Sequence, residues 1–356
     1  MFREKLKTYK NYEVEEKLYK IKLDANENLY PLDENLKSIL LSRLSQYIHR
    51  ISLYPDNNSD PLRNELSNFY NLSRNNFIIG NGSDQLIQVI MQAVCDKGDS
   101  ILTLKPSFVM YKITAGILDI NVEEVPFSEN WQVCPEEIVQ RAKEKRGVKA
   151  VFIDTPNNPT GVVFDKDKIS YIADELKDTL IVVDAAYSEF SSYEYIDLVG
   201  KHQNILILKT LSKIGFAGIR CGYAVSTEYI IENLLKVKPP YNVSLFTQII
   251  ACEVIKNFDL VKKNIEKIIG ERERLKVSLR ALGYEVLEGY GNFVSIVVGD
   301  GRLKEYLDSK GIAVRFFKLD EGKGILRITV GKEDQNQKFL EALKEWRGLC
   351  GEGKKG

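Results

Sequence analysis

The sequence predicts an α/β fold in which a large domain, built on a mostly parallel sheet covered by helices, is joined to a smaller α+β domain. Four short apolar runs have the length and composition of buried strands: 99–104, 149–153, 179–183 and 204–208. Three segments with apolar residues at helical spacing alternate with these runs: 83–94, 135–145 and 166–176. Strands and helices that alternate at these lengths indicate a parallel sheet with both faces covered.

The smaller domain is indicated by a change of pattern in the last third of the chain. A long, charged helical segment covers 260–282 and stops at Gly283, a residue type that commonly ends helices. Short strands are expected at 292–298 and 324–330, with a helix near 302–310 between them. This mixture of short strands and helices predicts an α+β unit.

The composition is that of a soluble globular protein and argues against several other classes. Of 356 residues, 44% are hydrophobic and 28% are charged, and this length suits one large and one small domain. Lysine plus arginine equals aspartate plus glutamate, at 50 each, so no net field favours nucleic acid or an anionic membrane. No apolar run approaches the roughly 20 residues of a membrane helix. The charged N-terminus predicts no secretory signal, and the polar tail 351–356 is expected to be disordered.

Cysteine and histidine usage limits the possible chemistry. Five cysteines are scattered without a paired spacing: Cys95, Cys134, Cys221, Cys252 and Cys350. An odd, unpaired set predicts free thiols and a reducing, cytoplasmic setting. The two histidines, His49 and His202, have no ligand partner at helical or strand spacing. We therefore expect no bound metal and no Ser–His–Asp triad.

The most informative stretch is 208–223, LKTLSKIGFAGIRCGY. Lys213 follows the hydroxyls of Thr210 and Ser212 and precedes Arg220 by seven residues. A lysine in a turn after a strand is usually a solvated surface cation. Hydroxyls before it and a guanidinium after it instead suggest an amine beside a bound phosphate.

Three further motifs supply what such a site needs, and each has a plain structural alternative. GNGSD at 80–84 opens a helix after an apolar run, and helix N-terminal amides bind phosphate; glycine-rich turns are also common without ligands. TPNNPTG at 155–161 is also simply a good turn sequence. VVDAAY at 182–187 places Asp184 at the end of a buried strand, where it is either functional, a helix cap or half of a salt bridge.

In combination and order, these motifs resemble the fold-type I, pyridoxal-phosphate-dependent aminotransferases, and their spacing is most similar to the histidinol-phosphate aminotransferases. The resemblance runs from Leu23 to Gly331. It implies that residues 1–45 join the small domain, that 46–258 form the large cofactor-binding domain, and that 259–350 form the connecting helix and the small domain. It also implies a homodimer.

The resemblance assigns the chemistry to three residues. Lys213 would form the Schiff base with the cofactor and, once displaced, move a proton between the substrate Cα and the cofactor C4′. Asp184 would hold the pyridine nitrogen protonated, which keeps the ring an electron sink. Tyr187 would donate to the phenolic oxygen of the ring, and Asn158 would bind the same oxygen.

The remaining cofactor contacts follow from the same resemblance. The phosphate would be held by residues from two motifs: Gly82, Ser83, Asp84, Thr210, Ser212 and Arg220. Ser83 and Asp84 would contribute mainly backbone donors. Phe108 would stack on the ring, although core packing also explains an aromatic there, and the nearby Tyr111 is ambiguous. Tyr54 would cross a dimer interface to the phosphate of the neighbouring subunit.

Substrate recognition is assigned to a further set: Tyr9, Asn26, Asn157, Arg315 and Arg327. Arg327, on an expected strand, would receive the acidic group of the substrate. Arg315 lies twelve residues earlier and would complete a two-guanidinium phosphate clamp; a surface salt bridge is the other interpretation. Asn26 belongs to the N-terminal signature LDANEN.

The expected reaction is transfer of the amino group of L-histidinol phosphate to 2-oxoglutarate in two half-reactions, giving imidazole-acetol phosphate and L-glutamate in histidine biosynthesis. An aromatic amino-acid aminotransferase is the main alternative, because a pocket for imidazole also accepts a phenyl ring. A decarboxylase related to the threonine-phosphate decarboxylases is a further one. A cofactor-sensing regulator is disfavoured, because only about 20 residues precede LDANEN and the net charge is zero.

Overall fold

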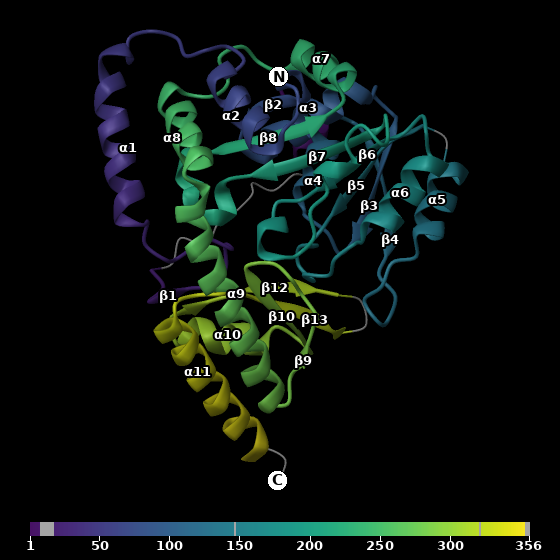
Figure 1. The fold of residues 1–356 in the computed structure, drawn as a ribbon. Helices are drawn as coiled ribbons and strands as arrows, with labels where there is room; N and C mark the ends of the chain where they lie inside the picture. The colour runs from purple at the N-terminus through teal and green to yellow at the C-terminus, as the bar shows by residue number, and fades with distance from the viewer. Residues whose placement is uncertain (8–17, 146, 320–321, 353–356) are drawn as a thin grey trace.

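The computed structural model describes residues 1–7, 18–145, 147–319 and 322–352, and it confirms the α/β fold that the sequence predicts (Figure 1). A large domain contains the main sheet, and a smaller domain holds the second sheet. The long helix α9 (Phe258–Ala281) runs from the large domain into the small one. It ends before Gly283, whose φ of 77° is accessible to glycine at little cost.

The main sheet has seven strands in the order β2-β8-β7-β6-β5-β3-β4. Their bounds are β2 (Phe77–Asn81), β3 (Ser100–Lys105), β4 (Asn121–Pro126), β5 (Val148–Asp154), β6 (Leu180–Asp184), β7 (Ile205–Thr210) and β8 (Cys221–Ser226). The neighbours from β7 to β4 pair in parallel, whereas β8 is antiparallel to both β2 and β7. The carboxyl ends of the parallel strands therefore lie along one edge.

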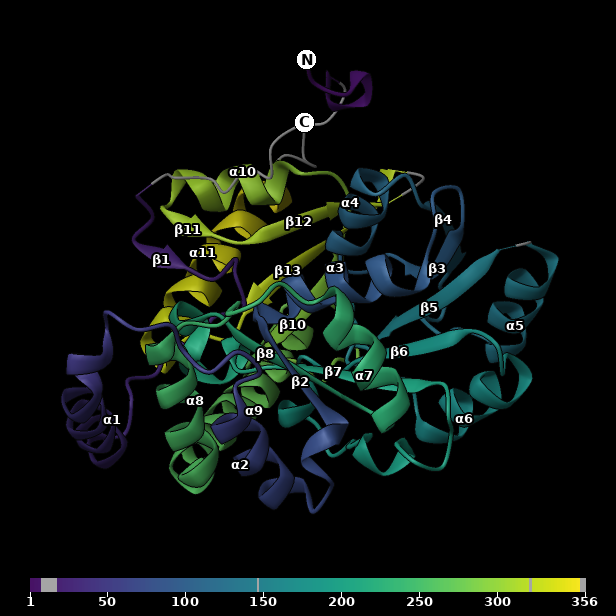
Figure 2. The same ribbon diagram turned by 90° about the horizontal axis from the view of Figure 1, so that it is seen from above.

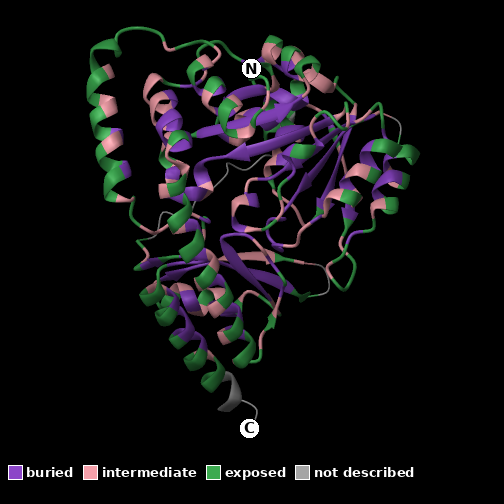
Figure 3. Ribbon diagram, viewed as in Figure 1, coloured by how far each residue is buried: buried purple, intermediate pink, exposed green. Residues whose placement is uncertain are grey.

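Helices cover both faces of this sheet, as the view from above shows (Figure 2). One face packs against α3 (Gly82–Val94), α4 (Met110–Ile117) and α7 (Glu228–Val237). The other packs against α2 (Asp60–Tyr70), α5 (Pro135–Glu144), α6 (Lys166–Glu175) and α8 (Leu245–Lys256). In β6, Val182 faces the first layer and Val183 the second. Strands β6, β7 and β8 are buried along their whole length (Figure 3).

The small domain contains an antiparallel sheet in the order β12-β13-β10-β9. Its strands are β9 (Glu285–Val286), β10 (Phe293–Val298), β12 (Arg315–Lys318) and β13 (Gly324–Thr329), and its helices are α10 (Arg302–Ser309) and α11 (Glu333–Glu352). Helix α11 continues two residues into the segment expected as a tail, and 353–356 lie outside the described residues. No helix in the described ranges is long and apolar enough to cross a membrane.

The N-terminal segment divides between the domains, which differs from the expectation that 1–45 is one part of the small domain. Strand β1 (Ile21–Lys22) pairs in parallel with β11 (Ile312–Ala313) of the small domain. Helix α1 (Glu34–Tyr47) instead packs against α8 of the large domain. Arg43 of α1 donates to Glu253 of α8 at 3.0 Å, so the charge pair and the buried leucines of α1 direct it to α8.

The two domains meet through close backbone contacts and hydrogen bonds. Gly161, at φ 79°, lies so close to Gly289 that a Cβ on Gly161 would come within 2.6 Å of the Gly289 Cα. Ser295 of β10 donates to the Pro159 carbonyl at 2.6 Å. Arg272 of α9 donates to the carbonyl of Phe190 in the large domain at 2.7 Å and to that of Gly291 in the small domain at 3.1 Å.

Gly161→Ala tests whether the backbone approach between the domains is required. Alanine at positive φ costs about 1 kcal/mol, and the overlap with Gly289 adds roughly 1–3 kcal/mol of overpacking. We expect a melting temperature several degrees below that of Gly200→Ala, because Gly200 also has a positive φ of 89° but has nothing within 4 Å of its Cβ position. Scanning calorimetry measures both melting temperatures. An equal decrease in the two variants would show that the close approach of Gly161 to Gly289 does not require glycine.

Candidate active site

The loops at the carboxyl edge of the large sheet bring most of the expected site residues together. Ligands in open α/β sheets bind at this edge. Three strands end there in polar residues: Asp154 on β5, Asp184 on β6 and Thr210 on β7. Asp154 and Asp184 are direct neighbours across β5 and β6.

Asp184 is a buried carboxyl whose environment suits a cationic partner. It is 4% exposed. Its Oδ2 accepts from the Tyr111 hydroxyl at 2.7 Å, and its Oδ1 accepts from the Ala186 amide at 3.2 Å. Burial, and then the nearby Asp154, raises the pKa of Asp184 to about 7. A carboxylate has about four acceptor sites, so two remain to receive a protonated ring nitrogen.

Lys213 lies in the irregular helical turn η6 (Ser212–Phe216), directly after β7. Its Nζ is 5.7 Å from the centroid of the Tyr187 ring. The Tyr187 hydroxyl accepts from Asn26 Nδ2 at 2.9 Å, which brings the N-terminal signature to the catalytic edge. Asn28 Nδ2 donates to the Ile214 carbonyl at 3.3 Å, so the same segment also contacts the lysine turn.

The residues expected to hold a phosphate form a cradle at the N-terminus of α3. Gly82 begins the helix with φ 77°, and a Cβ there would lie 2.6 Å from Arg220 Nη2. A Cβ on Gly222 would lie 2.4 Å from the Ser83 amide nitrogen. Glycines therefore allow β8 and the Arg220 guanidinium to approach the helix start, where amides and dipole favour an anion.

Side chains complete this cradle. Thr210 Oγ1 donates to Ser212 Oγ at 3.0 Å. Arg220 forms an ion pair with the Asp84 carboxylate at 2.8 Å, with both side chains nearly half exposed. Asp84 thus orients the guanidinium through its side chain, in addition to the backbone role expected for it. Amides, hydroxyls and one guanidinium make a donor set that fits a phosphate.

The asparagine motif lies between the two domains. Asn158 Oδ1 accepts from Arg327 Nη1 at 2.6 Å, and Arg327 also donates to the Asp24 carbonyl. Asn157 Oδ1 accepts from Thr160 Oγ1 at 2.6 Å, which closes the turn. Arg327 is 6% exposed, so the guanidinium of the small domain is held against the large-domain loop.

Arg315 lies directly opposite Arg327 across β12 and β13. Ser295 lies opposite Arg327 on its other side, in β10. Side chains of directly opposed residues project from the same face of a sheet. Because Ser295 bonds to the Pro159 carbonyl, this face is turned toward the large domain, and both arginines are on it.

The aromatic residues expected at the site lie in different surroundings. Phe108 packs edge-to-face on Tyr111, with ring centroids 5.6 Å apart. Tyr54 is 78% exposed and stacks on Tyr241, with ring centroids 4.7 Å apart. Tyr9 lies outside the described residues.

Sequence reasoning missed several residues of this edge. Asp154 was not singled out, although it ends an apolar run as Asp184 does, and that position was the available signal. Ser107 donates to Asp154 at 2.7 Å. Tyr111 was left ambiguous and is the hydroxyl partner of Asp184.

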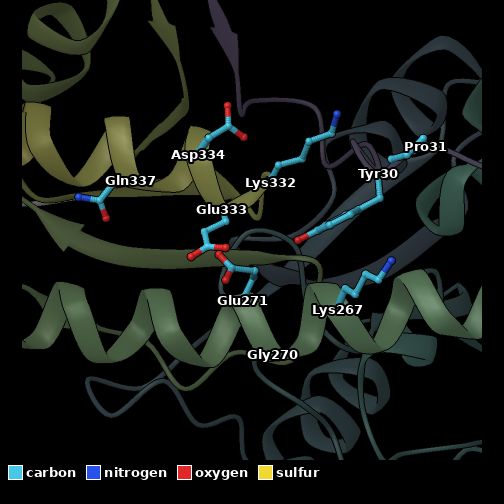
Figure 4. Close-up of a pocket in the computed structure, with 9 residues that line it drawn as sticks. All are labelled: Tyr30, Pro31, Lys267, Gly270, Glu271, Lys332, Glu333, Asp334 and Gln337. Carbon is cyan, nitrogen blue, oxygen red and sulfur yellow. The ribbon is translucent and has the colours of Figure 1, made fainter.

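A cavity with a volume of about 970 Å³ lies elsewhere in the structure. Its lining comes from α9, from the start of α11 and from the loop before α1 (Figure 4). Glu271 and Glu333 approach the Tyr30 hydroxyl there, and burial, followed by the charge of Glu271, raises the pKa of Tyr30. No residue expected at the active site lines this cavity.

Comparison with known proteins identifies relatives over nearly the whole chain. The family model for aminotransferase class I and II matches residues 19–343. The histidinol-phosphate aminotransferase of Caldanaerobacter subterraneus subsp. tengcongensis is 38% identical over 97% of this chain and 98% of its own. The histidinol-phosphate aminotransferase of Pyrococcus furiosus is 36% identical over 98% of this chain and 99% of its own.

Solved structures agree on the fold. The histidinol-phosphate aminotransferase from Clostridium acetobutylicum superposes with a TM-score of 0.83 at 25% identity, covering 92% of this chain and 99% of that one. The enzyme of the same name from Sinorhizobium meliloti, in complex with pyridoxal-5′-phosphate, superposes with a TM-score of 0.84 at 22% identity. This similarity covers 93% of this chain and 92% of that one. The second similarity, at this lower identity, bears on the fold alone.

Asp184→Asn tests the cost of the buried carboxyl in the ligand-free protein. The ordinary pKa of this carboxyl is 3.8 and the folded pKa is about 7. The folded state therefore binds more protons between these pH values, and the free energy of unfolding falls as pH rises through that window. Above pH 7 the loss is on the order of 4 kcal/mol.

We expect the asparagine variant to show a smaller pH-dependent fall than the wild type, whatever its absolute stability, because only the contribution of Asp154, whose pKa burial raises to about 6, remains. Urea unfolding at pH 5, 6, 7 and 8 measures it. The control is Asp167→Asn, at an exposed position on α6. If the curves of Asp184→Asn and the wild type run parallel in pH, the carboxyl does not titrate in this range.

Proposed function

The chain belongs to the class I and II aminotransferase family, and we propose that it transfers the amino group of L-histidinol phosphate to 2-oxoglutarate. The products would be imidazole-acetol phosphate and L-glutamate, a step of histidine biosynthesis. Relatives of that name, aligned over nearly the full length at 33–38% identity, support this substrate. Pyridoxal 5′-phosphate is the cofactor.

One observation of the structure carries the choice of substrate. Arg315 and Arg327 are directly opposed on adjacent strands, and like charges so placed destabilise a sheet unless an anion lies between them. Among the described residues, no carboxylate forms an ion pair with Arg315. A phosphate dianion benefits from two guanidiniums, whereas a carboxylate is satisfied by one.

The donor set around Lys213 fits the cofactor. The ring of bound pyridoxal phosphate, with its nitrogen protonated, withdraws electrons from the substrate Cα. The α3 cradle would hold the phosphate through the Gly82 and Ser83 amides, with the hydroxyls of Thr210 and Ser212 and the Arg220 guanidinium. Asp184 would accept from the ring nitrogen, as a buried carboxylate balanced by a cation.

The proton transfer is assigned to Lys213. Its amine, once free, would take the proton from the substrate Cα and return it at the cofactor C4′, two bonds away. Tyr187, oriented by Asn26, and Asn158, held by Arg327, would bind the phenolic oxygen of the ring. Phe108 would cover one face of the ring and exclude water.

We also propose a homodimer in the cytoplasm. Large hydrophobic side chains are exposed along α1 and the following loop, including Leu41, Ile48, Ile51, Leu53 and Tyr54. An exposed apolar band of this kind fits a subunit interface. Free thiols at Cys95 and Cys221, among others, suit a reducing compartment.

A spectral half-reaction titration tests the substrate. We expect L-histidinol phosphate to convert the bound cofactor to its pyridoxamine form at a far lower concentration than L-phenylalanine, L-tyrosine or O-phospho-L-threonine requires. Arg315→Gln should weaken histidinol phosphate by about tenfold or more and glutamate by much less, because a charged hydrogen bond contributes roughly 1.5–3 kcal/mol.

Two results would redirect the assignment. Preference for the aromatic amino acids would make the protein an aromatic aminotransferase and leave Arg315 as a structural residue. Carbon dioxide release from O-phospho-L-threonine would indicate a decarboxylase. Neither alternative is favoured by a specific contact in the structure.

Subunit mixing tests the shared site and Lys213 together. Lys213→Ala should lack the visible absorbance of the loaded enzyme, and Tyr54→Phe should bind the cofactor more weakly. In a mixed dimer, the Tyr54→Phe subunit keeps its own Lys213 and receives an intact tyrosine from its partner. We expect mixing after gentle denaturation to restore one tight site per dimer. No restoration, with sedimentation showing that dimers formed, would place Tyr54 outside the partner's site.

A further inference from the structure

Asp154 is a second buried carboxyl at the catalytic edge, and the proposed mechanism gives it no role. It ends β5 and lies directly beside Asp184 in the neighbouring strand. It is 4% exposed. A buried carboxylate is retained only when hydrogen bonds compensate for the water it loses.

Three donors from two loops meet this carboxylate. Its Oδ1 accepts from Ser107 Oγ at 2.7 Å and from Asn157 Nδ2 at 2.9 Å. Its Oδ2 accepts from the Asn158 amide at 2.8 Å. Ser107 immediately precedes Phe108, so one carboxylate joins the loop of the stacking aromatic to the loop of the two asparagines.

The bonds fix the direction of both asparagines. With its Nδ2 donated to Asp154, Asn157 presents its Oδ1 to the Thr160 amide at 3.1 Å and to the Thr160 hydroxyl. With its backbone held, Asn158 presents its Oδ1 to Arg327. The amide nitrogen of the Asn158 side chain is thereby left for another acceptor.

We propose that Asp154 is a positioning residue that holds Phe108 and Asn158 at a fixed separation around the cofactor ring, acting as an acceptor from Ser107, Asn157 and Asn158. This inference rests on the proposed placement of the cofactor between Lys213 and Asp184. Asp154 would act through these neighbours and would not touch the cofactor itself.

The ionisation of Asp154 gives the proposal a distinctive pH dependence. Burial raises the pKa of Asp154 to about 6, against the lowering effect of its three hydrogen bonds. The groups that face it are the Asp184 carboxyl on β6, the Tyr111 hydroxyl on α4, the Ser107 hydroxyl after β3 and the asparagine loop that Arg327 contacts from the small domain. A proton on Asp154 turns one acceptor site into a donor, so a loop donor loses its partner below pH 6.

The test is binding of pyridoxal phosphate to the full chain freed of cofactor, followed by absorbance and by circular dichroism of the bound cofactor from pH 5 to 8. We expect wild-type affinity to fall below pH 6. Asp154→Asn should bind about tenfold more weakly at pH 8, because one buried donor is left unpaired. Its affinity should fall less steeply below pH 6 than that of the wild type, because only the protonation of Asp184 remains. Its dichroism band should also change, since the ring is no longer held at the same angle.

Two further variants complete the design. Glu253→Gln removes another buried carboxylate, one paired with Arg43 between α1 and α8, and should keep the wild-type affinity, pH profile and dichroism. Ser107→Ala removes one donor without altering the carboxylate. It should weaken binding severalfold and change the dichroism while keeping the pH profile, and it serves if Asp154→Asn does not fold.

The outcomes separate the proposals. Wild-type affinity, pH profile and dichroism in Asp154→Asn, with only a lower melting temperature, would overturn the positioning role and leave Asp154 a structural residue. The same result in Ser107→Ala would overturn the link to the Phe108 loop. Failure of the wild-type chain to bind the cofactor would overturn the proposed function, and this inference with it.

Discussion

The buried carboxyl of Asp184 is the interaction on which the rest of the site depends. A carboxylate away from water is costly without a cation or several donors, and Tyr111 and Ala186 supply only two hydrogen bonds. In the proposed site, the protonated ring nitrogen of the cofactor would balance the rest of that cost. Because parallel strands end at one edge, the same sheet sets the lysine turn, the phosphate cradle and the asparagine loop around that position.

The sequence predicts the large domain well because its central strands are buried on both faces. Such strands appear as uninterrupted apolar runs. The run at 149–153 falls within β5, and the run at 179–183 begins one residue before β6. The edge strand β4 was not predicted, because its half-exposed NVEEVP has no such run. Helix α1 was also missed, since only Leu36 and Leu40 of its side chains are buried.

Site residues that are adjacent in sequence could be predicted from motifs. Residues that strand register brings together could be predicted less well. Lys213, Thr210 and Ser212 lie within one turn, so a motif reveals them. That Asp154 is beside Asp184 follows from strand pairing, and that Arg315 faces Arg327 follows from the register of β12 and β13. Tyr54 points to solvent in a single chain, so only a second subunit can give it an active-site role.

The pairing of β1 with β11 and the bond from the Asn26 amide to Thr329, 303 residues apart, have a consequence for biosynthesis. The segment that orients Tyr187 leaves the ribosome before the main sheet does, yet its partner Thr329 follows 303 residues later. The parallel sheet can form before this segment meets its partners, because a contact over such a separation forms late. A nascent chain would therefore acquire its fold well before it acquires a complete catalytic centre.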